Sequence, residues 1–245
     1  DTTGKQSPSG YDEWGLDLNL KFSLQKNTTL QFVSQLLQQQ HVPVYHKVRL
    51  ENFQLNEMDP QRRLFSYARL RKVNGSRIFK ETELTVSLQE GKEGRNNQKN
   101  GSQVLRQERD RVRTAGLTLD INSVLTRHWS ANSGIEVYLD KIFSTREDIN
   151  LSTAVADPKR GLYPDRSVYG NYSAYSLHHF NLGRWLLDAG IRFNQFTAKI
   201  SDTTIGDVRI NPSAFVYNAA ILYKLSKTQS VYLSYSSGFR APNID

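Results

Sequence analysis

The sequence of 245 residues contains no cysteine, which excludes disulfide bonds, cysteine-ligated zinc sites and thiol catalysis. It also lacks long apolar runs. Only 38% of the residues are hydrophobic, and no stretch approaches the roughly 20 apolar residues of a membrane-spanning helix. A helical membrane protein is therefore excluded. A membrane β-barrel is not, because its strands alternate between apolar and polar residues and average out as polar.

Signatures of common catalytic and cofactor sites are also missing. Gly91 and Gly94 lie in a charged stretch without the strand-to-helix context of a phosphate-binding loop. The histidines form no metalloprotease pair, and no serine sits in a nucleophile elbow. We therefore expect no enzyme activity, no metal and no cofactor. The net charge is +8, but basic residues are interleaved with Glu, Asp and Gln, which does not favour nucleic-acid binding.

The dominant pattern is an alternation of apolar and polar residues. From Leu16 to Leu24 every even position is apolar and every odd position is polar. Alternate side chains of a β-strand point to opposite sides, so this segment has one apolar and one polar face. Apolar residues share one face in the same way at 83–88, 117–122, 185–194 and 215–225. No comparably long segment has the 3.6-residue periodicity of an amphipathic helix.

Turn residues divide the pattern into hairpins. Short connections occur at 25–28, 182–184 and 226–229, and at Asn74-Gly75, where both residues tolerate positive φ. The other connections are long and cover 42–61, 90–103, 146–171 and 201–211. About ten strands are predicted on this basis, at 14–24, 29–41, 62–73, 77–89, 104–122, 129–145, 172–182, 185–199, 212–225 and 230–240.

The length of these strands indicates a class of fold. Several exceed the roughly 5–6 residues usual in soluble proteins and reach the roughly 9–11 residues with which a tilted strand crosses a bilayer. Short turns at one end and long loops at the other are typical of outer-membrane barrels. We therefore predict an all-β protein, an antiparallel up-and-down transmembrane β-barrel segment. A soluble β-sandwich, whose strands also alternate, is the structural alternative.

Four segments carry a family resemblance. Gly238-Phe239-Arg240-Ala241-Pro242 follows the last predicted strand, and Gly161-Leu162-Tyr163-Pro164-Asp165 lies in a long loop. The other two segments are the strand at 188–193 and the strand exit at 38–43. In this order and spacing, from Tyr11 to Asp245, they resemble the TonB-dependent outer-membrane receptors.

The resemblance implies a barrel of about 22 strands with a plugged lumen. Residues 1–245 would then be a partial β-barrel domain that lacks the plug domain and the C-terminal strands. Such a segment has two unpaired edges, so we expect no stable soluble monomer from the chain alone. The implied function is TonB-energised uptake of a scarce ligand (an iron–siderophore complex, haem, cobalamin or a glycan) across the bacterial outer membrane. The implied partners are outer-membrane lipid, TonB and the plug domain.

Six loop residues are candidates for ligand contact, namely His41, Tyr45, His46, Arg160, Tyr163 and Arg166. An exposed loop histidine would be able to ligate haem iron. The arginines and the tyrosine ring suit an anionic or aromatic ligand. Residues of these types are equally common on solvated loops. Arg240 would pair with a carboxylate of the ligand or plug, or with one in the barrel wall.

Two other functions remain open at this stage. A complete small barrel with hydrolase activity would need a charged catalytic cluster at the loop rim, such as His46 with Asp165 or Asp202. A soluble β-rich binding domain would use the long loops as its binding edge.

Overall fold

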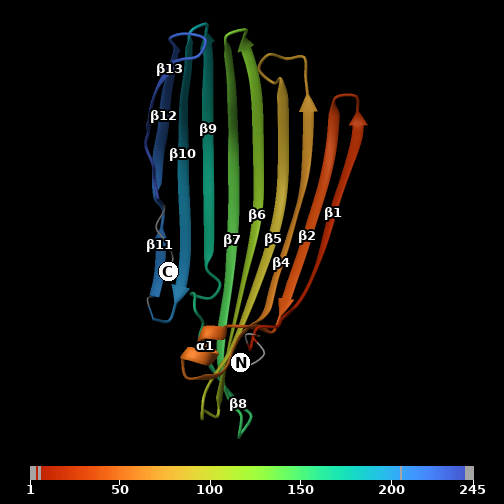
Figure 1. Cartoon of the computed structure of the whole chain (residues 1–245), viewed down its shortest axis with the longest axis vertical. Coiled ribbons are helices and arrows are strands. Elements are labelled where there is room, and N and C mark those ends of the chain that lie inside the picture. The colour runs from red at the N-terminus through yellow and green to blue at the C-terminus, as the bar shows by residue number, and fades with distance from the viewer. Residues whose placement is uncertain (1–3, 5–6, 205, 241–245) are drawn as a thin grey trace.

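The chain forms one large antiparallel sheet. The computed structural model describes residue 4 and residues 7–204 and 206–240. Its sheet contains 13 strands, and the neighbour order β1-β2-β4-β5-β6-β7-β9-β10-β12-β13 follows the order of the sequence (Figure 1). The predicted all-β, up-and-down architecture is therefore confirmed.

The elements differ widely in length. They are β1 (Asp12–Gln25), β2 (Thr28–Gln40), β3 (Val42–Pro43), α1 (Tyr45–Leu50), β4 (Phe53–Val73), β5 (Glu81–Lys99), β6 (Val104–Thr126), β7 (Trp129–Asn150), β8 (Val155–Arg160), β9 (Val168–Leu182), β10 (Trp185–Asp202), β11 (Gly206–Ile210), β12 (Ser213–Lys224) and β13 (Ser230–Ser236). None of the helices in the described part of the chain is long and apolar enough to cross a membrane.

Strand register sorts the side chains into apolar and polar rows. One row of opposed residues across β1 to β7 is entirely apolar and contains Phe22, Leu30, Leu70, Leu84, Leu119 and Ile135. The adjacent row is polar and contains Lys21, Gln31, Arg69, Thr85, Thr118 and Glu136. Because opposed residues point to the same side of a sheet, the two rows face opposite sides.

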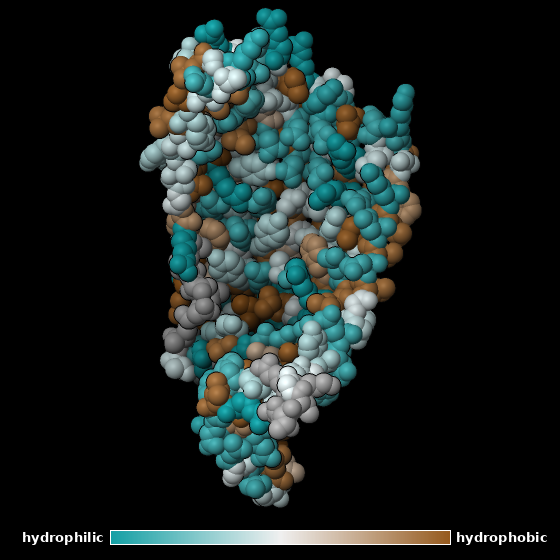
Figure 2. Space-filling view, in the orientation of Figure 1, coloured by the Kyte–Doolittle hydropathy of each residue, from teal (hydrophilic) through white to brown (hydrophobic). Residues whose placement is uncertain are grey.

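The polar face is the inner side of the curved sheet. Figure 2 shows the hollow lined largely by hydrophilic side chains. On this face Arg71 Nη2 lies 2.6 Å from Glu81 Oε2, and Arg192 Nη2 lies 2.5 Å from Glu136 Oε2. The outer face carries large apolar side chains that are largely exposed, such as Leu16 and Leu88, each 62% exposed. We call this exposed apolar zone of the outer face the apolar band.

The two ends of the sheet differ. The short turns lie at the top of Figure 1, and α1, β8 and β11 lie at the bottom, which we call the long-loop end. Here the strands continue past the apolar band. After Leu88 the outer face of β5 becomes charged, and Arg113 Nε of β6 donates to Glu90 Oε2 at 2.7 Å.

The expectation of a long loop at 90–103 is therefore wrong. β5 runs on to Lys99 and β6 begins at Val104, so only four residues connect them. β4 likewise begins at Phe53, inside the predicted loop 42–61. The β5 extension is polar on both faces, so it lacks the alternation that marks a strand with one buried side. The β4 extension contains Phe53, Leu55 and Met58, but register shifts between Phe53 and Leu55 and between Met58 and Gln61 interrupt its pairing.

The last predicted strand also ends earlier than expected. β13 stops at Ser236 rather than at residue 240. The Phe239 ring instead packs against Phe196 of β10, with ring centroids 5.8 Å apart. Arg240 is exposed, and Ala241 and Pro242 lie outside the described residues.

Ion pairs strengthen the extended hairpin of β6 and β7. Asp148 Oδ1 accepts from Arg106 Nε at 3.1 Å, and its Oδ2 accepts from Arg146 Nη2 at 2.8 Å. The hydrogen bond from Arg146 is the largest of the effects that lower the pKa of Asp148 to about 2, and Arg106 adds to it against the opposing effect of burial.

This lowered pKa predicts a pH dependence. The stabilisation is complete above the ordinary carboxyl pKa near 3.8 and is lost as the pH falls through about 2. In the full-length protein, amide hydrogen exchange at the long-loop ends of β6 and β7, around Arg106 and Asp148, should speed up, after correction for intrinsic rates, between pH 5 and pH 2. Asp148→Asn should raise exchange severalfold at pH 5, because such ion pairs contribute about 0.5–1 kcal/mol. A pH dependence that survives in Asp148→Asn would contradict this assignment.

Candidate functional site

The hollow face has a pocket at the long-loop end, which we call the wall pocket. Its volume is about 400 Å³. β2, β4, β5 and β6 supply its walls, and the loop between β8 and β9 adds Tyr163. The polar and charged residues that line it include Gln61, Arg63, Gln89, Glu93, Arg95 and Asp110. Strand register places Glu93, Asp110 and Ser144 opposite one another on β5, β6 and β7.

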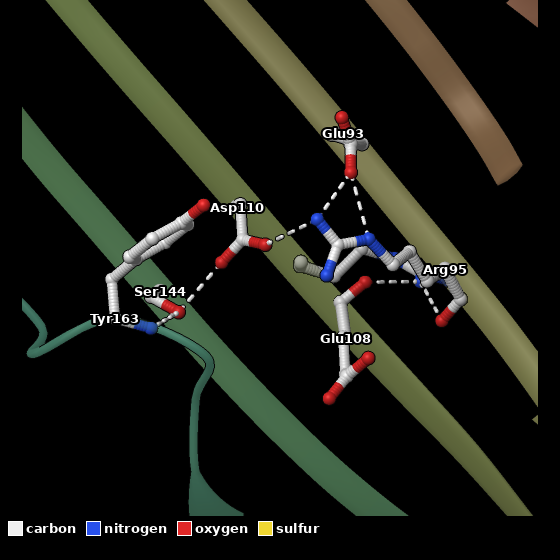
Figure 3. A network of polar contacts seen from close by, with 7 residues as sticks. Glu93, Arg95, Glu108, Asp110, Ser144 and Tyr163 are labelled. Carbon is white, nitrogen blue, oxygen red and sulfur yellow. Dashed lines mark hydrogen bonds and ion pairs between the residues drawn. The ribbon is translucent and has the colours of Figure 1, made fainter. Parts of the chain in front are cut away.

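A polar network joins these strands to the loop (Figure 3). Ser144 Oγ donates to Asp110 Oδ1 at 2.6 Å and accepts a hydrogen bond from Tyr163 N at 3.1 Å. Arg95 Nε donates to Glu93 Oε1 at 2.7 Å, and Arg95 Nη2 lies 3.7 Å from Asp110 Oδ2. The network thus reaches from β5 across β6 and β7 to the loop.

Part of this network is buried, so its polar groups depend on partners within the protein rather than on water. Asp110 is only 8% exposed and Ser144 only 2%. Burial disfavours the charge on Arg95, but the hydrogen bond and charge of Glu93, with the charge of Asp110, outweigh burial and raise the Arg95 pKa. Arg95 therefore stays cationic beside the pocket.

Guanidinium groups on the inner face give the pocket a means of binding an anion. Strand register places Arg63, Glu93, Arg95 and Asp110 on this face, whereas Arg62 and Lys92 border the pocket from positions of the outer face, where Lys92 Nζ lies 3.2 Å from Glu90 Oε1. Guanidinium groups bind carboxylate and phosphate oxygens in a bidentate geometry. The pocket can therefore take an anionic group, with the Tyr163 ring beside it.

The loop residues predicted to bind a ligand do not gather at one place. Of the six, Tyr163 lines the wall pocket. Arg160 Nε donates to Asp202 Oδ2 at 2.8 Å, so this guanidinium is already paired. Arg166 is exposed and lines a second pocket of about 580 Å³. Tyr45 and His46 lie on α1, where His46 is exposed.

His41 lies at another place, where β2 leaves the sheet. Its Nδ1 is 3.8 Å from Glu57 Oε2 and 3.9 Å from Asp59 Oδ2. Neither acidic partner was predicted from the sequence. The pairing of Val42 with Met58 brings His41 close to these two carboxylates. Their proximity follows from the strand register and is not visible in the sequence.

The carboxylates suggested for a hydrolase have other partners. Asp202 is engaged with Arg160, and Asp165 Oδ1 accepts a hydrogen bond from Ser144 N at 3.0 Å. Within the part of the chain that the structure describes, no hydrogen bond or ion pair joins His46 to either residue.

Ser144 is predicted to fix the loop that carries Tyr163. Ser144→Ala removes both bonds of Ser144 Oγ and leaves Asp110 Oδ1 and Tyr163 N without them, at a cost of about 1–3 kcal/mol. In the full-length protein, trypsin should cleave after Arg166 about tenfold faster or more. Ser133→Ala is the matched control, because Ser133 Oγ shares a hydrogen bond of 2.7 Å with Ser176 Oγ away from this loop. Equal cleavage rates in the two variants would show that Ser144 does not fix the loop.

Solved structures share this fold. The chain matches the structure of the copper transporter OprC with a TM-score of 0.82 at 14% identity, covering 99% of this chain and 39% of that one. It matches the ferric citrate transporter FecA in its unliganded form with a TM-score of 0.65 at 13% identity, covering 94% and 36%. It matches the alcaligin receptor FauA from Bordetella pertussis with a TM-score of 0.60 at 12% identity, covering 92% and 35%.

These likenesses concern the fold alone, and the chain spans less than two fifths of the length of these three proteins. None of the curated protein sequences matches it significantly. The family model described as "TonB dependent receptor-like, beta-barrel" matches residues 1–245. The chain therefore belongs to the TonB-dependent receptor β-barrel family.

Proposed function

We propose that this chain forms part of the wall of an outer-membrane receptor that takes up a scarce ligand with energy supplied through TonB. The distribution of side chains on the two faces of the sheet carries the proposal. The outer face presents an apolar band, and the inner face of the same strands is ionic. A barrel wall between lipid and a hydrated or plugged lumen needs this arrangement.

The limits of the apolar band support a membrane position. On β6 the outer positions Ala115, Leu117 and Leu119 are apolar, and the next outer position toward the long-loop end is Arg113. A charged side chain on a lipid-facing position costs about 2–4 kcal/mol at the bilayer midplane and little near the interface. The apolar-to-charged change at Arg113 therefore suits an interface, with the wall pocket beyond it.

The two alternatives from the sequence have less support. TonB-dependent receptors are outer-membrane transport proteins and not enzymes, so the family argues against a hydrolase. A soluble sheet would leave the large apolar band in water, which is unfavourable and promotes association.

An anionic iron chelate is the ligand class that fits the wall pocket best. Arg63 and Arg95 present guanidinium groups on the inner face of the pocket, and such groups bind carboxylate oxygens in a bidentate geometry. The proteins of similar structure include a ferric citrate transporter and a receptor for alcaligin. Tyr163 and Arg95 would contact this ligand, and the plug domain of the full receptor would close the lumen beneath it.

The membrane position predicts an asymmetry between neighbouring residues. Leu117 lies on the outer face, opposite Val86 and Val137, and Thr118 lies on the inner face, opposite Glu136. In the full-length barrel in lipid vesicles, Leu117→Arg should lower the free energy of unfolding by about 2–4 kcal/mol. Thr118→Arg should cost much less, because its guanidinium faces the lumen near Glu136. Urea unfolding measures both, and equal costs would contradict the assignment of the two faces.

Uptake by cells tests the function itself. Cells that express the full-length receptor should accumulate radioactive iron from ferric citrate or another anionic chelate only when TonB is present. Haemin, cyanocobalamin, a maltodextrin and copper serve as comparison ligands. Accumulation of no tested ligand, or accumulation that persists without TonB, would overturn the proposal.

The wall pocket can be tested in the same cells. Arg95→Gln should reduce uptake at limiting chelate about tenfold, because a charged hydrogen bond contributes about 1.5–3 kcal/mol. Arg113→Gln is the matched control, since Arg113 is also ion-paired but lies on the outer face. Equal uptake by the two variants would exclude Arg95 from ligand binding.

A further inference from the structure

We propose that His41, Glu57 and Asp59 form a binding site for one divalent transition-metal ion at the long-loop end. His41 Nδ1, a Glu57 oxygen and an Asp59 oxygen all lie within 4.8 Å of one another. The proposal concerns binding to the folded wall and does not depend on the transport activity.

The local fold brings these three residues together. β3 pairs with the first part of β4, with Val42 opposite Met58 and Pro43 opposite Glu57. The pairing of β4 with β5 is irregular between Met58 and Gln61, and both the Glu57 and the Asp59 carboxylate lie within 3.9 Å of His41 Nδ1. His41 adopts a φ of 54° at the end of β2, and this turn brings the imidazole to the two carboxylates.

A second layer of contacts orients Glu57. Asn96 Nδ2 donates to Glu57 Oε1 at 3.0 Å, and Arg109 Nη2 donates to Asn96 Oδ1 at 3.0 Å. Asn96 itself is buried. One carboxylate oxygen is thus fixed by the wall, and Oε2 is the oxygen near His41. Partners of this kind, which orient a ligand without touching the ion, are usual around metal sites.

The charge balance also points to a cation. The side chains of Glu57 and Asp59 are only 17% and 22% exposed. Among the described residues, His41 is the one basic group that forms an ion pair with either carboxylate. An imidazole supplies a full positive charge only when protonated, and two carboxylates that share a site repel each other. A divalent cation between them would remove this repulsion.

The ligand set selects the class of ion. One imidazole with two carboxylates suits zinc and neighbouring transition metals, whereas magnesium and calcium prefer oxygen ligands alone. Zinc bonds of about 2.0–2.2 Å place tetrahedral ligands roughly 3.3–3.6 Å apart. His41 Nδ1 lies 3.8 and 3.9 Å from the two carboxylate oxygens, and all three ligand atoms lie within 4.8 Å of one another, so the carboxylates must close by about 1 Å at most to reach this geometry. The imidazole is 62% exposed, so water or another molecule can complete the coordination.

Metal titration of the purified full-length receptor tests the site. Zinc is the probe, magnesium is the comparison ion, and calorimetry or equilibrium dialysis measures the stoichiometry. His41→Asn removes the imidazole and keeps a residue that tolerates positive φ. Glu57→Gln removes a charge and keeps an oxygen that accepts from Asn96. His46→Asn is the matched control, because His46 is also exposed and lies on α1 outside the cluster.

The wild-type receptor and His46→Asn should bind one more zinc ion than His41→Asn. Glu57→Gln should weaken binding at this site by about tenfold or more, since loss of an orienting partner alone costs about 10–100-fold. Magnesium should not compete at equal concentration. A heat-dependent shift in electrophoresis shows whether each variant is folded, and if His41→Asn fails to fold, Glu57→Gln against His46→Asn decides. Equal zinc binding in wild type and both cluster variants would overturn the proposal, as would loss of the site in His46→Asn.

Discussion

The register of the antiparallel ladder is the constraint on which the whole structure depends. Side chains alternate along each strand, so a slip of one residue would exchange the two faces of that strand. Such a slip in β4 would place Arg69 in the apolar row now occupied by Leu30, Leu70 and Leu84. The sheet has almost no packed core to compensate, because Ala131, Ala198 and Ile200 are the buried apolar residues of the described chain. The separation of faces, rather than a core, specifies the fold.

The sequence predicts this fold well wherever one face is apolar. The ten strands of the main path were predicted in their order, and β1 and β2 agree with the predicted ranges to within two residues. The prediction failed where both faces are polar, as in the segment from Glu90 to Lys99. In this segment backbone hydrogen bonds and ion pairs hold the strands together. The sequence shows no alternation of apolar and polar residues there, so the strand could not be predicted. The six-residue helix α1 is too short to show a helical period.

The sites were less predictable because they depend on residues far apart in the chain. Tyr163 was found as an aromatic residue in a basic loop, but its partners Asp110 and Ser144 were not. The hydrogen bond between these two joins positions 34 residues apart, and only the register of β6 and β7 places them opposite each other. His41 was likewise found as a loop histidine, whereas Glu57 and Asp59 become its neighbours only through the short β3–β4 pairing.

The same constraint explains why polar sites concentrate at the long-loop end. Inside the apolar band, a strand has one face free for polar groups, and ion pairs such as Arg192–Glu136 already occupy it. Beyond the band both faces tolerate charge, so the walls can carry the arginines and carboxylates of a binding site. The loops there are fixed by discrete polar bonds, such as those of Ser144, instead of apolar packing. Each such bond contributes about 1 kcal/mol net. An incoming ligand that offers a few charged groups can therefore compete with the bonds that fix a loop, while the ladder of the wall, with a backbone bond at nearly every residue, stays intact.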